Sequence, residues 1–289
     1  MNDLLKRSVT AFFFAIVMLG GICWSENSFI LLLAVINAVC IWEFSQLSGK
    51  ILKLDSSQLL INSIINSCIA TLLFFEFVAW YFDNKFSITM PAALLLTPVF
   101  YIAKEVLIKK SNSIMNAGSA MLGFFYVTVP MILLVFMLDL LSDFETGYAF
   151  DETYPVLMIL FLIWTNDTMA YFTGRMFGRN KLYESLSPKK TWEGFFGGMI
   201  FTIIVAFVLQ HFNFIRKDAI DAVMIGLLVS VFGTIGDLFE SMMKRQAGVK
   251  DSGIILPGHG GLLDRFDAFL LAIPFVFVYE ILRPVHSMM

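Results

Sequence analysis

Long apolar stretches alternate with short polar segments along this chain. Nine stretches are mostly apolar and lie at roughly residues 8–24, 28–47, 58–82, 86–108, 115–141, 154–176, 193–212, 222–244 and 262–283. An α-helix needs about 20 such residues to cross the hydrocarbon core of a bilayer. Because backbone groups in lipid must be paired within the protein, each stretch is predicted to be a helix. The residue-by-residue alternation of a barrel strand is absent from the sequence.

The composition also indicates a membrane protein. Of the 289 residues, 58% are hydrophobic and only 15% are charged, whereas a soluble domain is about 45–50% apolar. The mean hydropathy is +0.79. We therefore predict an all-α integral membrane protein, a polytopic bundle of about nine transmembrane helices.

Basic residues predict the orientation of this bundle, because cytoplasmic loops carry an excess of Lys and Arg. With the N-terminus in the cytoplasm, 16 of the 20 basic residues fall on the inner side. The outer side keeps Lys85, Arg216, Lys217 and Arg283. A cytoplasmic N-terminus is therefore expected.

Polar residues are unevenly distributed. The first five spans look nearly free of interior charge, while charged residues and glycines gather in residues 164–198 and 233–267. We therefore predict N-terminal transmembrane scaffold helices over residues 1–150. Residues 151–289 are predicted to form a catalytic transmembrane region with its active site on the cytoplasmic side.

The segment 233–267 combines carboxylates, basic residues and glycines. On a helix, Asp237, Glu240, Ser241 and Lys244 share one face at i, i+3, i+4 and i+7. Asp237 is predicted to lie roughly 10 Å from its helix end, just inside the hydrocarbon. A charge at that depth is costly, so such a carboxylate is expected to face a partner, an ion or a water-filled cavity.

Together these residue types predict a metal-assisted phosphoryl or nucleotidyl transfer site. Carboxylate oxygens on separate helices suit magnesium, basic side chains suit phosphates, and glycines let backbone amides approach an anion. The candidate catalytic residues are Asp237, Ser241, Lys244, Arg245, Lys250, Asp251, His259, Asp264, Arg265 and Asp267.

The second polar segment, 164–198, supplies candidates for substrate binding. Asp167 is expected to face the helix bundle, and the run Ser187-Pro188-Lys189-Lys190-Thr191 could hold a nucleotide triphosphate. The predicted substrate-binding residues are Asp167, Ser187, Lys189, Lys190, Gly260 and Gly261.

Each candidate also has a purely structural interpretation. Asp237 could be a salt-bridged carboxylate, Asp167 could hydrogen-bond within the bundle, and Asp267 could pair with a nearby basic residue. His259 could be a loop residue satisfied by backbone carbonyls, and the basic residues could be ordinary membrane anchors. For Gly194 and Gly198, which form a GxxxG step, helix packing is the preferred interpretation.

The run SMMKRQAGVKDSGIILPGHGGLLDRFD (241–267) resembles the signature of the phosphatidate cytidylyltransferase family, also called CDP-diacylglycerol synthases. The runs GDLFES and NDTMAYFTGRMFGRNKL with SPKKTWEG resemble the same family, so the similarity covers about 164–267. It implies a nucleotidyltransferase of phospholipid biosynthesis that converts CTP and phosphatidate into CDP-diacylglycerol and pyrophosphate.

The resemblance further implies a magnesium cofactor held by Asp237 and Asp264, with room for a monovalent cation such as potassium beside it. It also implies a homodimer. The expected location is a bacterial cytoplasmic (inner) membrane, crossed several times, with the active site facing the cytoplasm. The lipid bilayer, CTP and phosphatidate are the expected partners, and no nucleic acid is expected.

Four rival functions are weighed at this point. A purely structural membrane protein is the least favoured, since it would not place so many costly charges in two spans. A CTP-dependent kinase for a polyprenol or similar lipid alcohol would release CDP instead of pyrophosphate. A CDP-diacylglycerol phosphotransferase is disfavoured because its DGxxAR…GxxxDxxxD pattern is absent. An ion channel or transporter would line a pathway with these aspartates, but no charged path continues toward the outer face.

Overall fold

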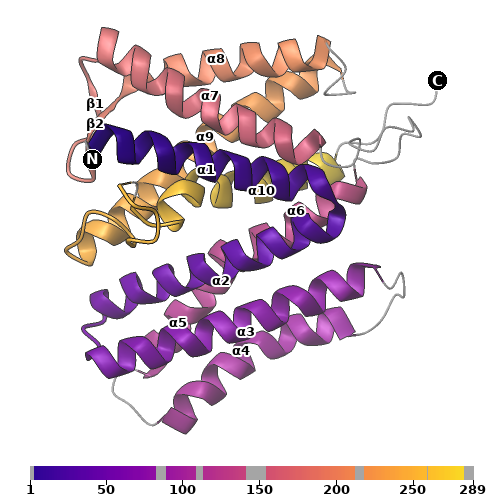
Figure 1. The fold of residues 1–289 in the computed structure, drawn as a ribbon, viewed down its shortest axis with the longest axis vertical. Helices are drawn as coiled ribbons and strands as arrows, with labels where there is room; N and C mark the ends of the chain where they lie inside the picture. The colour runs from indigo at the N-terminus through magenta and orange to yellow at the C-terminus, as the bar shows by residue number, and fades with distance from the viewer. Residues whose placement is uncertain are drawn as a thin grey trace. The chain divides into compact units, whose positions relative to one another are not determined.

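Helices form almost all of the regular structure in the computed structural model, which describes residues 3–82, 89–108, 113–140, 154–211, 218–258 and 260–282. Within these ranges the helices are α1 (Asp3–Trp24), α2 (Glu26–Ile51), α3 (Ser56–Phe82), α4 (Thr89–Ile108), α5 (Ser113–Gly123), the π-helical turn η1 (Phe124–Thr128), α6 (Val129–Leu140), α7 (Tyr154–Phe177), α8 (Trp192–His211), α9 (Ala219–Gln246) and α10 (Leu263–Leu282) (Figure 1). A short hairpin, β1 (Lys181–Tyr183) and β2 (Ser187–Thr191), lies between α7 and α8.

Every predicted span corresponds to helix in the described ranges. The stretch 115–141 becomes the continuous run α5–η1–α6, and each other stretch becomes one helix. Six of these segments are long and apolar enough to cross a membrane by themselves. Large apolar side chains such as Phe12, Leu95 and Ile204 are exposed along the helices, as expected of surfaces that face lipid. The chain is a multi-pass membrane protein.

The helices belong to two compact units. The first consists of Met1–Phe136 and Met243–Arg265, and the second of Met137–Met242 and Phe266–Met289. The predicted boundary at residue 150 divides the chain by function, into a scaffold and a catalytic region. This division stays a prediction. His259 and the four basic residues predicted on the outer side (Lys85, Arg216, Lys217 and Arg283) lie outside the described residues.

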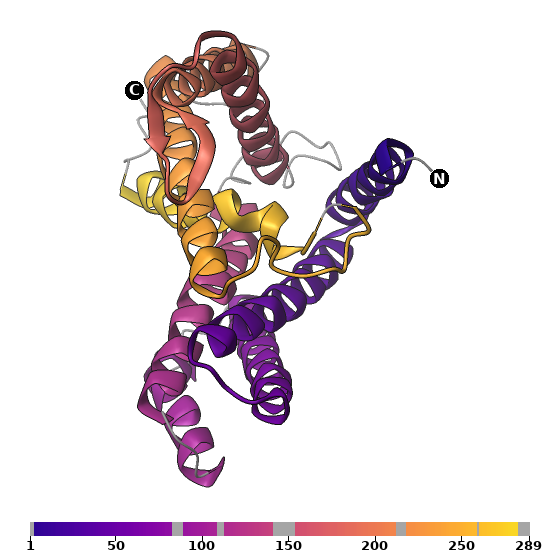
Figure 2. The ribbon, with the colours of Figure 1, turned by 90° about the vertical axis from the view of Figure 1, so that its left-hand side faces the viewer.

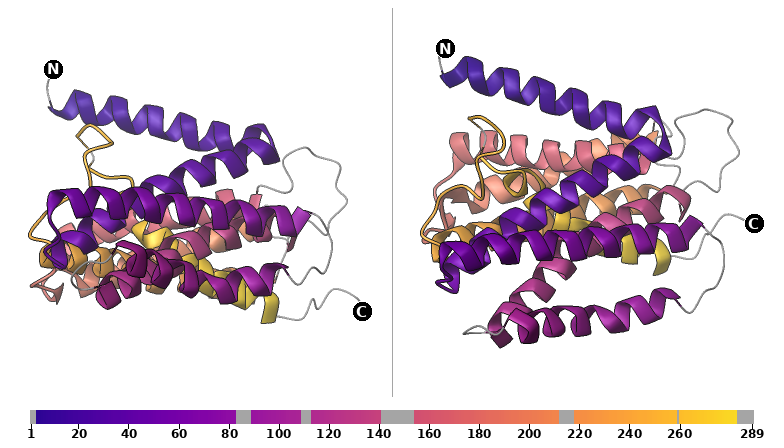
Figure 3. Two further views of the ribbon diagram at one scale, coloured as in Figure 1. Left: turned by 90° about the horizontal axis from the view of Figure 1, so that it is seen from below. Right: turned by 60° about the horizontal axis from the view of Figure 1, so that its bottom comes forward.

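In the first unit, α2 contacts α1, α3 and α5 (Figure 3). Its side chains Phe29, Leu33 and Phe44 are almost fully buried. Gly123 at the end of α5 lets the Phe44 ring approach, since a Cβ there would lie 2.8 Å from a ring carbon. Helix α2 is therefore the buried centre of this unit.

A buried polar network links four helices of the first unit. The Lys104 ammonium on α4 lies 2.7 Å from the Glu105 carboxylate and donates to the Asn66 Oδ1 atom on α3 at 2.9 Å. Asn66 donates to the Ser45 hydroxyl on α2, and Asn116 on α5 donates to Glu105. Buried polar groups need such partners, so the network favours one arrangement of these helices.

The run α5–η1–α6 contains a wide turn with an identifiable cause. The Val129 N–H bonds to the Phe124 carbonyl, five residues back. Pro130 follows directly. Proline has no N–H and its ring collides with the carbonyl four residues earlier. A π-helical turn next to it relieves that collision without ending the helix.

In the second unit, α7 and α8 pack closely through small residues. A Cβ on Gly198 would lie 2.9 Å from both the Ala170 Cβ and the Asn166 carbonyl oxygen, and a Cβ on Gly194 would lie 2.8 Å from the Ala170 carbonyl oxygen. The two backbones can approach this closely only because the glycines lack side chains. The packing role predicted for Gly194 and Gly198 is confirmed.

The second unit also pairs parts of α9 and α10. The rings of Phe232 and Phe275 stack, and the Tyr279 hydroxyl donates to Asp221 at 2.6 Å. Gly236 on α9 lies against the backbone of Asp267 on α10, where any Cβ would overlap the carbonyl oxygen.

Candidate functional site

A compact loop, residues 247–262, connects α9 with α10. Helix α9 ends where Gly248 adopts a φ of +69°, and the Val249 N–H donates to the Lys244 carbonyl at 2.9 Å. Glycine adopts a positive φ without steric cost and commonly ends helices in this way. The C-terminal end of α9 is therefore set by a glycine of the predicted signature.

The second half of the loop is a tight turn. Leu256 and Gly260 exchange two backbone hydrogen bonds of 3.0 and 3.1 Å, and Gly258 and Gly260 have φ angles of +79° and +87°. The Thr10 hydroxyl on α1 donates to the Pro257 carbonyl at 3.0 Å, and the loop lies beside α1 in Figure 2. The loop is thus held by its own hydrogen bonds and by the N-terminal helix.

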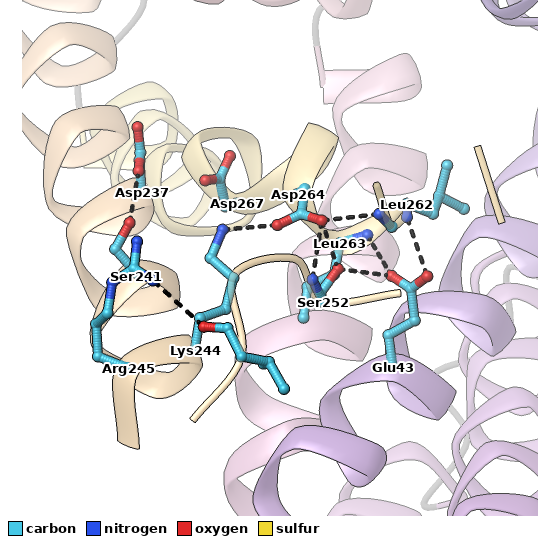
Figure 4. A network of polar contacts seen from close by, with 12 residues as sticks. Glu43, Asp237, Ser241, Lys244, Arg245, Ser252, Leu262, Leu263, Asp264 and Asp267 are labelled. Atoms are coloured by element: carbon cyan, nitrogen blue, oxygen red, sulfur yellow. Dashed lines mark hydrogen bonds and ion pairs between the residues drawn. The ribbon is translucent and has the colours of Figure 1, made fainter. Parts of the chain in front are cut away.

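Asp264, in the first turn of α10, is the centre of a dense set of contacts (Figure 4). Its Oδ1 atom accepts from the Lys244 ammonium at 2.6 Å. Its Oδ2 atom accepts from the Gly261 N–H at 2.7 Å, from the Ser252 N–H at 3.0 Å and lies 3.0 Å from the Ser252 hydroxyl. The Asp264 side chain is only 8% exposed. These contacts fix the orientation of its carboxylate.

Glu43 on α2 contacts the same segment. Its Oε1 atom accepts from the Leu262 N–H at 3.1 Å, and its Oε2 atom accepts from the Leu263 N–H at 2.7 Å. The Ser252 hydroxyl lies 3.1 Å from Oε2. Glu43 is not among the residues predicted from the sequence, because the first five spans look nearly free of interior charge. A single carboxylate between Trp42 and Phe44 in an apolar span was the signal that could have found it.

A polar cavity of about 600 Å³ opens at the loop. Its lining combines two basic side chains, one carboxylate, glycines and two aliphatic residues: Lys250, Asp251, Gly253, Ile254, Leu256, Gly258, Gly260 and Arg265. Exposed ammonium and guanidinium groups beside glycine backbone are suited to bind phosphate oxygens. Of the predicted residues, Lys250, Asp251, Gly260 and Arg265 meet here.

In the second unit, Asp237 forms an ion pair with Lys190 of β2. The Ser241 hydroxyl, one helical turn further on, donates to Asp237 Oδ1 at 3.3 Å. Both members of the ion pair are about one third exposed. Asp237 and Ser241 therefore share one face of α9, as predicted, and the basic partner of Asp237 is Lys190 of the hairpin.

Two other predicted residues make local contacts. Asp267 accepts from the N–H of Ala268 at 2.7 Å, and Arg245 donates to the Val249 carbonyl at 3.3 Å near the end of α9. Both contacts are consistent with a structural interpretation, and their predicted catalytic roles stay predictions.

Asp167 lies off the face of α7 that packs against α8, and the expectation that it faces the helix bundle stays a prediction. Asp167 is exposed, whereas its neighbour Asn166 is only 4% exposed. Consecutive helical residues point about 100° apart, and the face of α7 toward α8 runs through Asn166, Ala170 and Gly174. Its predicted role in substrate binding stays a prediction.

The β1–β2 hairpin presents the predicted triphosphate-binding run. Lys181 donates from its ammonium to the Pro188 carbonyl at 2.6 Å, and Lys189 is exposed. Glu193, at the start of α8, accepts from the backbone and side-chain amides of Asn180. Ser187 begins β2 and is partly buried. The hairpin is therefore anchored at its base, with Lys189 accessible to a ligand.

The donor chemistry of Asp237 and Asp264 fits magnesium. Each is a carboxylate that holds a cationic partner, Lys190 or Lys244. Magnesium typically binds one or two carboxylates together with phosphate oxygens of a substrate. In the described ranges, no group of three or more His, Cys, Asp or Glu could hold a metal ion. Asp237 belongs to the second unit and Asp264 to the first, and their sharing of a metal stays a prediction.

Comparison with known proteins agrees with the resemblance seen in the signature. The profile of the cytidylyltransferase family matches residues 5–282. A phosphatidate cytidylyltransferase of Bacillus subtilis (strain 168) is 32% identical over 277 residues, which cover 96% of this chain and 97% of that protein. A phosphatidate cytidylyltransferase of Staphylococcus haemolyticus (strain JCSC1435) is 37% identical over 184 residues, or 63% of this chain and 66% of that protein. The chain belongs to the cytidylyltransferase family.

Proposed function

We propose that this chain is a phosphatidate cytidylyltransferase, which joins CTP to phosphatidate in phospholipid biosynthesis. The supporting observation is the similarity to the Bacillus subtilis phosphatidate cytidylyltransferase, which extends over 96% of the chain. A membrane-embedded chain with a phosphate-suited cavity at its signature loop agrees with a substrate that is both a lipid and a phosphate.

The proposed reaction is a displacement at phosphorus. An oxygen of the phosphatidate phosphate attacks the α-phosphorus of CTP, and the bond from that phosphorus to the β-phosphate bridging oxygen breaks. CDP-diacylglycerol and pyrophosphate are the products. The attacking phosphate oxygen is already anionic, so the step does not require a general base.

The side chains of the chain supply position and charge for this step. Lys250 and Arg265 line the cavity and bind phosphate oxygens there. Lys244, held 2.6 Å from Asp264, keeps that carboxylate in place. Asp237 and Asp264 would hold magnesium, whose positive charge, when bound, offsets the negative charge that the triphosphate carries.

We further propose a bacterial cytoplasmic (inner) membrane as the location, with the signature loop facing the cytoplasm, and a homodimer as the assembly. In the predicted topology, most basic residues lie on the same side of the membrane as the N-terminus, and this excess supports the orientation. The family resemblance supports the homodimer and a monovalent cation beside the magnesium.

A product assay with the purified chain tests the proposed function. We expect labelled CTP and phosphatidate to give CDP-diacylglycerol and pyrophosphate only when magnesium is present. Asp264→Asn replaces one carboxylate oxygen by an amide that donates, so turnover is expected to fall at least about 100-fold. Normal turnover of this variant would reject a metal-binding role for Asp264.

The released nucleotide separates the proposal from its rivals. Release of CDP with transfer of one phosphate to a lipid alcohol would identify a kinase instead. Magnesium flux through liposomes without CTP would identify a channel or transporter. Either result, in the absence of CDP-diacylglycerol, would overturn the proposed function.

A further inference from the structure

Glu43 is a carboxylate inside an apolar helix. Its side chain is only 2% exposed, and α2 is otherwise long and apolar enough to span a membrane. A buried carboxylate loses its hydration and is tolerated only where donors replace the water. An apolar residue of similar volume often packs there at lower cost. The presence of a carboxylate at this position therefore indicates a specific role for Glu43.

The hydrogen-bond partners of Glu43 in the described residues belong to one short part of the chain. The Leu262 and Leu263 N–H groups stand at the first turn of α10, and Ser252 stands in the loop before it. The first N–H groups of a helix have no partner within the helix, and a negative charge beside them is favourable. Glu43 thus caps α10 from a helix that lies more than 200 residues earlier in the sequence.

The same segment also contacts Asp264, on the side opposite to Glu43. The Ser252 hydroxyl lies 3.1 Å from the Glu43 carboxylate and 3.0 Å from the Asp264 carboxylate. The Gly261 N–H, one residue before the capped pair, donates to Asp264 at 2.7 Å. In Figure 4 the two carboxylates flank this segment. Any shift of the segment on its Glu43 side therefore moves the donors that orient Asp264.

Two glycines of the loop are explained by Glu43. A Cβ on Gly253 would overlap the Glu43 carboxylate, and a Cβ on Gly261 would overlap both that carboxylate and the Ser252 hydroxyl. Neither glycine is among those with a positive φ. Glycine is therefore required at these two positions to leave space for the Glu43 side chain, and not for an unusual backbone conformation.

From these contacts we propose that Glu43 is a positioning residue of the active site. It holds Ser252 and the Leu262 and Leu263 amides in place. Ser252 and the adjoining Gly261 N–H in turn hold the Asp264 carboxylate in one orientation. The described lining of the 600 Å³ cavity does not include Glu43, so it acts through Asp264 rather than by touching substrate. This role rests on the proposed function for its catalytic consequence, whereas its structural part can be measured independently.

The test compares Glu43→Gln with a matched control, Glu76→Gln. Glu76 is an exposed carboxylate on α3 of the same unit. A glutamine at position 43 turns one acceptor into a donor that faces backbone N–H groups. We expect kcat to fall about 10- to 100-fold, with less than about a threefold change in the KM for CTP. Hydrogen–deuterium exchange of peptides covering 252–264 should rise about tenfold, with that of the 181–191 hairpin unchanged. Glu76→Gln should match the wild type in both.

A second variant, Gly261→Ala, keeps the test decisive if Glu43→Gln does not fold. It displaces the Glu43 and Ser252 side chains without removing a charge, so the same local exchange and the same loss of kcat are expected. Exchange that rises uniformly over the chain, or wild-type kcat and wild-type protection of 252–264, would overturn the positioning role.

Failure of the proposed function would look different. In that case the wild type and Glu76→Gln would form no CDP-diacylglycerol, while Glu43→Gln would still raise exchange selectively at 252–264. That pattern would reject the reaction and support the role of Glu43 in holding Asp264.

Discussion

Individual glycines in the signature loop serve different physical needs. Gly248 and Gly260 both have a positive φ, of +69° and +87°. A Cβ on Gly248 would meet nothing within 4 Å, whereas a Cβ on Gly260 would lie 2.7 Å from the Asp264 carboxylate. The first glycine therefore serves backbone conformation alone, and the second also leaves room for the predicted metal ligand.

This difference predicts distinct outcomes for Gly248→Ala and Gly260→Ala. Both should lose about 1–2 kcal/mol of stability, because a side chain is strained at a positive φ. Gly260→Ala should also displace Asp264 and lower CTP turnover at least about tenfold, while Gly248→Ala keeps most of its turnover. Thermal unfolding in detergent and the product assay measure the two effects. Equal losses of turnover would contradict the separation.

For single residues, the sequence predicted which residue types belong to the candidate site better than it predicted which residues they contact. The i, i+4 relation on α9 correctly placed Ser241 beside Asp237. Glu43 was missed because its contacts join residues more than 200 positions apart, and no local pattern contains them. The sequence did not show that Asn166, rather than its neighbour Asp167, lies on the face of α7 that packs against α8.

Among the elements, the spans were predictable because bilayer thickness fixes the length of an apolar helix. All nine predicted stretches coincide with helix in the described ranges, with ends that agree within a few residues. The β1–β2 hairpin and the η1 turn were not predicted. The hairpin is short and polar, and the π-helical turn depends on one proline, Pro130, inside a uniformly apolar run.

The contact between α7 and α8 predicts a sharp difference between two glycines. Gly198→Ala would place a Cβ 2.9 Å from the Ala170 Cβ, whereas Gly118→Ala on α5 would meet nothing within 4 Å. Overpacking of this kind costs about 1–3 kcal/mol. We therefore expect Gly198→Ala to lower the melting temperature in detergent and Gly118→Ala to leave it unchanged. An unchanged melting temperature of Gly198→Ala would contradict this prediction, because it would show that α7 and α8 can move apart without losing stability.

For the whole molecule, the distribution of basic residues is the main source of information on orientation. The family and the multi-pass character are established by the profile match and by the apolar helices. The sequence could suggest a cytoplasmic site but not its shape, because the cavity is formed by loop residues whose backbone angles are set by glycines.

Orientation can be tested by labelling one engineered cysteine. Ser185→Cys, at an exposed position of the hairpin, is placed in a chain whose Cys23, Cys40 and Cys68 are replaced by serine. A membrane-impermeant maleimide should label it in inside-out vesicles and fail to do so in intact cells, because the hairpin is predicted to face the cytoplasm. Labelling in intact cells would reverse the assigned topology.

The bond between α2 and the start of α10 also bears on how the protein is made. Helix α2 leaves the ribosome long before Leu262 and Leu263 are synthesised, so Glu43 must enter the membrane without the amides that later receive its carboxylate. Until synthesis is nearly complete, this side chain has to be tolerated by lipid, water or the insertion machinery. The signature loop therefore gains its anchor only in the final stage of biogenesis, and a nascent chain lacking α10 cannot assemble it.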